Sequence, residues 1–147
     1  MTKVKGIYCL NKDEIIRGYN AFKNILTGSK VLSNGFLKLN IQIKKEISEN
    51  IGNQIYKNPL ANVKVGFVVS KRIVKKASLR NRLKRLTRES YRLNKYLLIA
   101  LNDYRVYLLF SYSENYKDTF KNLKFDDVNE NTKLLLKKAI EFINKKK

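Results

Sequence analysis

Residues 65–95 read VGFVVSKRIVKKASLRNRLKRLTRESYRLNK and join an apolar run to a long basic segment. The apolar run, residues 63–70, is short and rich in Val and Phe, which predicts a buried β-strand. Leucines then recur at helical spacing and, at about 100° per residue, fall within one narrow arc of a helix over residues 78–97. These leucines are Leu79, Leu83, Leu86, Leu93 and Leu97. The stretch therefore predicts a strand followed by a helix that docks on the sheet by one leucine stripe.

The same segment concentrates positive charge. Residues 71–95 contain eleven Lys and Arg residues and a single acid, Glu89, so their net charge of 11 − 1 = +10 is half of the chain's +20. An ordinary solvated helix face mixes the two signs through Glu and Lys pairs four residues apart. Because crowded like charges cost stability unless a polyanion neutralises them, we favour an RNA-binding surface over a merely solvated face. Arg suits this role because it holds phosphate oxygens bidentately and stacks on bases.

The sequence before this stretch predicts one helix and a hairpin. Apolar side chains at helical spacing predict an amphipathic helix over residues 14–26, with Asp13 as its N-cap. Strict alternation over residues 36–43 predicts a half-buried strand whose leucine and isoleucine side chains share one face. A shorter strand at residues 30–33 joins it through Asn34-Gly35, a common hairpin turn.

The remaining segments complete a single domain. Residues 44–62 are polar and contain the only proline, which predicts an exposed loop. Aromatic and aliphatic residues predict a further strand over residues 104–112, and helical spacing predicts a final helix over residues 129–145. A length of 147 residues fits one domain. We therefore predict one RNA-binding α+β domain over residues 1–147, in the order helix, strands, helix, strand, helix.

The composition excludes several classes of protein. The chain has no His, no Trp and one Cys, Cys9. The usual zinc-ligand sets, Ser/His/Asp and Cys/His catalytic groups and a disulfide framework therefore cannot be assembled. Hydrophobic residues make up 44% of the chain, which is enough to form a core. The sequence has no run of apolar residues long enough to span a membrane and no export signal, so we expect a cytoplasmic protein.

Three runs together resemble the bacterial ribonuclease P protein component. They are Val65-Gly66-Phe67-Val68-Val69-Ser70-Lys71-Arg72, Lys75-Lys76-Ala77 and Arg80-Asn81-Arg82-Leu83-Lys84-Arg85-Leu86-Thr87-Arg88-Glu89. They match the strand, the loop and the motif helix of that family. The order of the other predicted helices and strands agrees with the family across most of the chain.

The resemblance implies a fold and a function. The fold is a compact α/β sandwich with a small, mostly antiparallel sheet, of the class of the second domain of ribosomal protein S5. Its βαβ crossover is left-handed, against the general rule. The function is that of the small subunit of ribonuclease P, whose RNA subunit and Mg²⁺ ions remove the 5′ leader of precursor tRNA. The resemblance thus implies ribonuclease P RNA and precursor tRNA as partners, with no obligate protein partner and no binding to a membrane. It also implies that the protein has no catalytic or metal-ligating residue and no organic cofactor.

The resemblance also assigns candidate site residues. Those for RNA binding are Lys71, Arg72, Lys75, Lys76, Arg80, Asn81, Arg82, Lys84, Arg85, Arg88 and Arg92, and we predict phosphate contacts for Arg80, Arg82, Lys84, Arg85 and Arg88. The family's leader cleft is lined by aromatic residues, and the matching positions here are Phe22, Leu26 and Leu39, with Asn81 at one edge. A leucine gives apolar contact but no stacking surface. Phe22 is as consistent with plain core packing as with the cleft.

Other functions remain open from the residues alone. A generic RNA-binding or ribosome-associated protein would share the charge, and a reconstitution assay separates it from a ribonuclease P subunit. A membrane-surface protein would need a broad apolar helix face, whereas this leucine stripe is narrow. Asp126 and Asp127 could ligate a metal but fit a helix cap better. Tyr104, Tyr107 and Tyr112 could stack on bases but fit packing in the sheet better.

Overall fold

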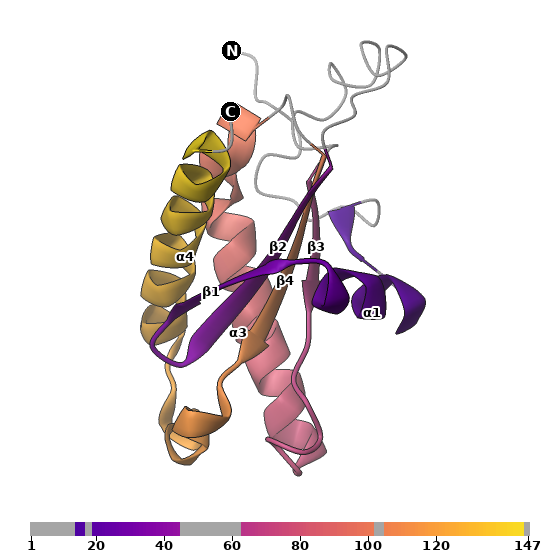
Figure 1. Cartoon of the computed structure of the whole chain (residues 1–147). Helices are drawn as coiled ribbons and strands as arrows, with labels where there is room; N and C mark the ends of the chain where they lie inside the picture. The colour runs from indigo at the N-terminus through magenta and orange to yellow at the C-terminus, as the bar shows by residue number, and fades with distance from the viewer. Residues whose placement is uncertain (1–13, 17–18, 45–62, 102–104, 146–147) are drawn as a thin grey trace.

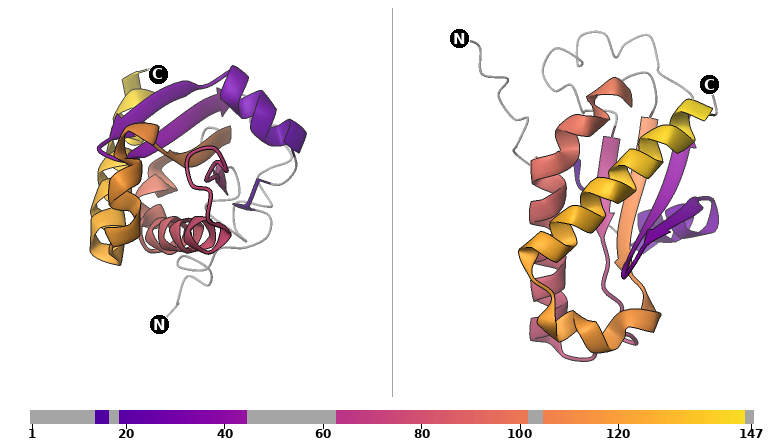
Figure 2. Two further views of the ribbon diagram at one scale, coloured as in Figure 1. Left: turned by 90° about the horizontal axis from the view of Figure 1, so that it is seen from below. Right: turned by 90° about the vertical axis from the view of Figure 1, so that its left-hand side faces the viewer.

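The computed structural model describes residues 14–16, 19–44, 63–101 and 105–145 (Figure 1). The elements in chain order are α1 (Tyr19–Thr27), β1 (Lys30–Asn34), β2 (Leu37–Lys44), β3 (Val63–Phe67), α3 (Ala77–Asn94), the 3₁₀ segment η3 (Lys95–Leu101), β4 (Arg105–Tyr112), the 3₁₀ segment η4 (Glu114–Asn122) and α4 (Phe125–Lys145). One sheet separates α1 from α3 and α4, which lie together on the other face (Figure 2). This arrangement confirms the predicted α+β sandwich.

The sheet has the strand order β1-β2-β4-β3. The pairs β1–β2 and β2–β4 are antiparallel, and β3 is parallel to β4. The chain passes from β3 through α3 to its parallel neighbour β4, and α3 lies on the face away from α1 (Figures 1 and 2). With that placement the crossover is left-handed, as the resemblance implied, and departs from the usual rule.

Alternation along the strands places the main core between the sheet and the pair α3 and α4. Leu37, Leu39 and Ile41 of β2 lie opposite Tyr112, Phe110 and Leu108 of β4, and all six are buried. From the helices, Leu83, Tyr91, Leu135, Leu136 and Ile143 are buried against them. The predicted half-buried strand over residues 36–43 is therefore confirmed.

A smaller cluster lies on the other face, under α1. It consists of Ile16, Ile25 and Leu109, with Phe22, Val68 and Tyr107 packed against it. Asn40 alternates onto this face, yet it is buried and its Nδ2 donates to Ser29 Oγ at 3.0 Å. The face that alternation assigns to solvent is thus partly covered.

The opening helix is shorter than predicted. The sequence predicts it over residues 14–26, but α1 begins at Tyr19. The backbone of Ile16 instead donates to the carbonyl of Val65 at 2.8 Å, so this segment lies along the edge of β3. Long-range pairing has overridden local helical spacing. The predicted cap, Asp13, lies outside the described residues.

The predicted hairpin is confirmed, with its turn displaced by one residue. Asn34 and Leu37 are paired, so the two-residue loop consists of Gly35 and Phe36. Gly35 has φ of 59°, the sign required at the first position of both primed turn types that suit two-residue hairpins.

Helix α3 begins one residue before the predicted start and ends at Asn94, after which the chain continues as η3. Its buried residues are Leu83, Thr87, Ser90, Tyr91 and Asn94, while Leu79, Leu86 and Leu97 are only partly buried beside them. The predicted leucine stripe is therefore one flank of a wider buried face. Thr87 on that face is satisfied, since its Oγ1 lies 2.6 Å from Tyr112 Oη and donates to Leu83 O at 2.8 Å, whereas the buried hydroxyl of Tyr91 has no hydrogen-bond partner among the described residues.

Helix α4 begins four residues before the predicted start. The backbone N–H of Lys124 donates to Asp127 Oδ2 at 3.1 Å, and both Asp126 and Asp127 lie in the first turn. This confirms their interpretation as a cap. The predicted loop, residues 44–62, lies outside the described residues except for its first residue, which ends β2.

Both outer strands have backbone groups engaged on their outward side. Lys138 Nζ of α4 donates to the carbonyl of Ser33 in β1 at 3.0 Å, and the backbone of Ile16 donates to Val65 O of β3. Asn34 Nδ2 adds a bond of 2.7 Å to Asn131 Oδ1. These contacts tie α4 and the segment before α1 to opposite edges of the sheet.

Candidate nucleic-acid interface

The outward face of α3 presents cations to solvent. Asn81, Arg85 and Arg88 are exposed, and Lys84 and Arg92 are partly exposed. Spacings of four, three and four residues place Asn81, Arg85, Arg88 and Arg92 on one side of the helix. These four residues therefore line one side of α3, which we call the outward row.

The loop before α3 extends the basic surface beyond the end of the helix. Lys71, Arg72, Lys75 and Lys76 are all exposed. Arg72 Nη2 lies 3.8 Å from Glu114 Oε2, but both side chains are largely exposed, so this ion pair contributes little to stability. These four residues add to the positive charge that the outward row carries.

Arg80 does not belong to the outward row. Its Nη1 donates to the carbonyls of Val74 and Lys75 at 2.9 and 2.8 Å. The guanidinium therefore folds back onto the loop that precedes the helix.

Arg82 also points inward. Its Nη2 donates to the carbonyl of Leu123, in the segment between η4 and α4, at 2.6 Å. Its Nη1 is buried and has no hydrogen-bond partner among the described residues. Of the five residues predicted to contact phosphates, the structure thus places Lys84, Arg85 and Arg88 toward solvent and directs Arg80 and Arg82 to backbone carbonyls.

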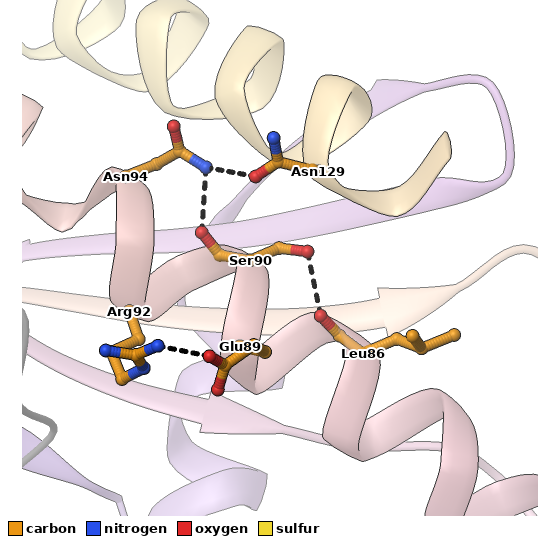
Figure 3. Close-up of polar contacts among 6 residues, drawn as sticks. All are labelled: Leu86, Glu89, Ser90, Arg92, Asn94 and Asn129. Atoms are coloured by element: carbon orange, nitrogen blue, oxygen red, sulfur yellow. Dashed lines mark hydrogen bonds and ion pairs between the residues drawn. The ribbon is translucent and has the colours of Figure 1, made fainter. Parts of the chain in front are cut away.

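The single acid of α3 is paired within the helix. Glu89 accepts a hydrogen bond from Arg92 one turn later, and this bond holds the pKa of the Glu89 carboxyl below its usual value (Figure 3). On the side toward α4, Ser90 donates to Leu86 O and Asn94 donates to both Ser90 O and Asn129 Oδ1. One edge of the helix thus faces solvent with charge while the other is fastened to α4.

Lys95 contributes to the sequence charge but not to the surface. Its Nζ donates to Glu14 Oε1 and Oε2 at 2.9 and 3.1 Å, and the two side chains are 0% and 1% exposed. Lys95 is one of the eleven cations of residues 71–95, for which the sequence favoured an RNA-binding surface, and for this residue that interpretation is wrong. Its partner lies 81 residues away, so helical spacing carries no signal of it.

The proposed cleft residues do not all lie on one face. Phe22 is partly exposed and stands over Gly66, where an added Cβ would lie 2.7 Å from its Cε1. Leu26 is 56% exposed at the end of α1. Leu39 is fully buried on the opposite side of the sheet, under α3 and α4, so its assignment to the cleft is wrong. The physical reason is alternation, which places Leu39 with Leu37.

Other residues on the α1 face were not among the predicted site residues. Lys64 is paired with Tyr107 and Lys38 with Ser111, so these four side chains share the α1 face of the sheet. All four are partly exposed. The signal was available in the sequence, since they alternate with the apolar residues of their strands. Tyr112 is buried in the core as predicted, and Tyr104 lies outside the described residues.

The arrangement of these basic side chains is suited to binding anions. Among the described residues, no three His, Cys, Asp or Glu side chains lie together in a way that could hold a metal ion. None of the helices in the described ranges is long and apolar enough to cross a membrane. What the surface offers is a row of guanidinium groups, with Lys84 next to it on α3, and such groups neutralise phosphates.

Sequence comparisons give one consistent family. The profile of the Ribonuclease P family matches residues 10–140. The ribonuclease P protein component of Chlorobaculum tepidum is 33% identical over 119 residues, which cover 76% of this chain and 72% of that protein. The corresponding protein of Serratia proteamaculans is 49% identical over 45 residues, which cover 31% of this chain and 38% of the relative.

Solved structures share the fold at low sequence identity. The RNase P protein of Staphylococcus aureus superimposes with a TM-score of 0.60 at 20% identity, covering 86% of this chain and 94% of that chain. The RNase P protein of Thermotoga maritima gives a TM-score of 0.59 at 23% identity, covering 80% and 89%.

Proposed function

The chain belongs to the ribonuclease P protein family, the protein components of an endoribonuclease that matures the 5′ end of tRNA, and on this premise we propose how it works. We propose that the outward row of α3 and the loop before it bind ribonuclease P RNA, and that the α1 face of the sheet binds the 5′ leader of precursor tRNA. The observation that carries the first part is the row of exposed cations whose only acidic neighbour within residues 71–95 is Glu89.

Electrostatics supports the RNA partner. A second helix of the same protein, α4, has an exposed face on which Lys133 and Lys137 lie between Glu130 and Glu141, as on an ordinary solvated helix. The outward row has a single acid of α3 beside it, Glu89, which pairs with Arg92, so the row carries a large excess of cations. Its cations gain most when phosphates displace their counterions, which makes the affinity steeply dependent on salt.

The chemistry of cleavage is assigned to the RNA subunit and to Mg²⁺. The metal would supply an activated water and stabilise the charge on the leaving oxygen. Asp127, one of the two acids considered as metal ligands, accepts the backbone N–H of Lys124 as a helix cap, and no three possible ligands lie together among the described residues. The part of this chain is to bind the RNA, to neutralise phosphates close to the site and to hold the leader.

For the leader, Phe22 is the candidate stacking residue. It is partly exposed beside Tyr107 and Val68, and the absence of a side chain at Gly66 leaves room for its ring against the sheet. Base stacking on an aromatic ring contributes about 1–3 kcal/mol per base. Phe22→Ala should therefore weaken binding of precursor tRNA and leave binding of mature tRNA, which has no leader, nearly unchanged.

Reconstitution tests the proposal. The protein is added to ribonuclease P RNA and precursor tRNA at a Mg²⁺ concentration at which the RNA alone cleaves slowly, and the rate of leader removal is measured. We expect a clear increase, which the double variant Arg85→Ala/Arg88→Ala largely loses. The matched control, Lys133→Ala/Lys137→Ala, removes the same charge from the mixed face of α4 and should retain the effect.

The alternative of a generic RNA-binding protein predicts a different outcome. Such a protein would bind many RNAs through the same cations without accelerating leader removal. If no cognate RNA is stimulated while binding persists, the proposed function is wrong and the generic interpretation stands.

A further inference from the structure

We propose that Arg80 and Arg82 are positioning residues that hold the protein's own backbone, and that RNA phosphates are contacted by the outward row instead. This inference rests on the proposed function only for the identity of the RNA. It divides the Arg80-Asn81-Arg82 triplet, since Asn81 is exposed on the outward side while its two neighbours turn inward.

Arg80 fixes the start of the basic surface. Its Nη1 donates to the carbonyls of Val74 and Lys75, two residues that precede α3. The N-cap residue, Lys76, makes no side-chain cap, so the chain enters the helix without the usual local restraint. The guanidinium of Arg80, in the first turn of the helix, replaces the missing cap by binding the backbone just before α3. It thereby holds the loop that carries Lys71 and Lys75.

Arg82 fastens α3 to the segment that leads into α4. The acceptor, Leu123 O, belongs to a residue that is 6% exposed and directly follows η4. The second terminal nitrogen of Arg82 is buried, so the head of the side chain lies inside the protein rather than at its surface. A group in this position would have to break a charged hydrogen bond to a buried carbonyl before it could reach a phosphate.

The outward row supplies a geometric alternative. Asn81, Arg85 and Arg88 are exposed at spacings that repeat along one side of the helix, with Arg92 one turn further. A backbone that tracks this side meets cations on successive turns without moving Arg80 or Arg82. The inward arginines therefore affect RNA binding through the loop and the helix that they hold.

The test compares inward and outward arginines replaced by Met, which keeps the aliphatic stem and removes only the guanidinium. Binding of ribonuclease P RNA is measured against salt at 10 °C for variants whose circular dichroism shows that they are folded, and thermal unfolding is measured without RNA. Arg85→Met and Arg88→Met should each reduce the magnitude of the log–log salt slope by about 0.7–0.9 and leave the melting temperature unchanged. Arg80→Met and Arg82→Met should leave the slope unchanged and lower the melting temperature by roughly 2–8 °C.

One readout separates positioning from mere support of the fold. Arg80→Met should weaken RNA binding by roughly 3–10-fold at fixed salt, because the loop must be ordered on binding, and Arg80→Lys should restore most of the loss by donating to the same carbonyls. The inference is overturned if Arg80→Met or Arg82→Met reduces the slope as Arg85→Met does with no change in melting temperature. If instead none of the four variants changes the slope, the proposed RNA contact of α3 fails, while the loss of melting temperature at Arg80 and Arg82 still supports their inward role.

Discussion

Replacing Lys95 with Met is expected to lower the free energy of unfolding by about 3–5 kcal/mol, the usual cost of removing one member of a buried ion pair. Lys95 Nζ contacts both carboxylate oxygens of Glu14 within 3.1 Å, and neither side chain has appreciable exposure. Without the ammonium group, Glu14 keeps its burial and loses the counter-charge that Lys95 supplies. The bond also joins the segment before α1 to the end of α3, so its loss loosens two distant parts of the chain.

The assay is thermal and urea-induced unfolding followed by circular dichroism. At about 2–4 °C per kcal/mol for a domain of this size, Lys95→Met should lower the melting temperature by roughly 6–20 °C. The double variant Glu14→Gln/Lys95→Met leaves no buried charge without a partner, so it should recover much of that loss. Lys137→Met, which removes an exposed lysine from α4, is the control and should change little.

The burial of Lys95 also has a consequence for RNA binding. Because Lys95 is buried, its removal should not alter the salt slope of RNA binding by the folded protein. A shift in melting temperature below about 2 °C, or a reduced salt slope in Lys95→Met, would refute the inward placement of this cation.

Three further outcomes follow from the core and the α1 face. Tyr91→Phe should leave the unfolding free energy unchanged or raise it by up to about 1 kcal/mol, because the buried hydroxyl of Tyr91 has no hydrogen-bond partner among the described residues. Tyr112→Phe should lower the unfolding free energy by about 1 kcal/mol, because it removes the contact with Thr87. Urea denaturation measures both values, and a larger loss for Tyr91→Phe than for Tyr112→Phe would contradict the hydrogen-bond assignment. Burial raises the pKa of Tyr112 from its ordinary value of 10.0 to about 12, so between these values the folded state keeps a proton that the unfolded chain has lost. The resulting contribution to the unfolding free energy is fully present below pH 10 and should decline as pH rises toward 12. Urea denaturation at a series of pH values would show a flat or rising trend if the hydroxyl were solvated. Gly66→Ala should displace the ring of Phe22, whose Cε1 would lie 2.7 Å from the added Cβ, and lower the unfolding free energy by about 1–3 kcal/mol. The displaced ring should also reduce the preference of the protein for precursor tRNA over mature tRNA. An unchanged preference would show that Phe22 is not part of the proposed cleft.

Features set by neighbouring residues were predictable from the sequence. Alternation over residues 36–43 correctly identified the buried face of β2, and the Asn34-Gly35 pair correctly located the hairpin. The motif helix was placed to within one residue at its start. In each case the information lies within a few positions of the residue concerned, as period and turn chemistry require.

Features set by distant partners were not predictable from spacing. The helix predicted from residue 14 begins at Tyr19 because the segment before it pairs with β3, and Lys95 turns inward because Glu14 meets it across the fold. Arg82 finds its acceptor 41 residues away. Leu39 was assigned to the cleft through the resemblance, although its own alternation with Leu37 placed it in the core, and the local pattern was correct.

The contacts at the two edges of the sheet bear on how the free protein behaves in concentrated solution. An outer strand whose amide and carbonyl groups are unpaired can hydrogen-bond to a strand from another molecule, and many β-sheet proteins aggregate in this way. Here the ammonium group of Lys138 donates a hydrogen bond to a carbonyl of β1, and the backbone N–H of Ile16 donates to a carbonyl at the outer edge of β3. Purified protein held without RNA should therefore resist fibril growth even though Val31, on β1, is 50% exposed.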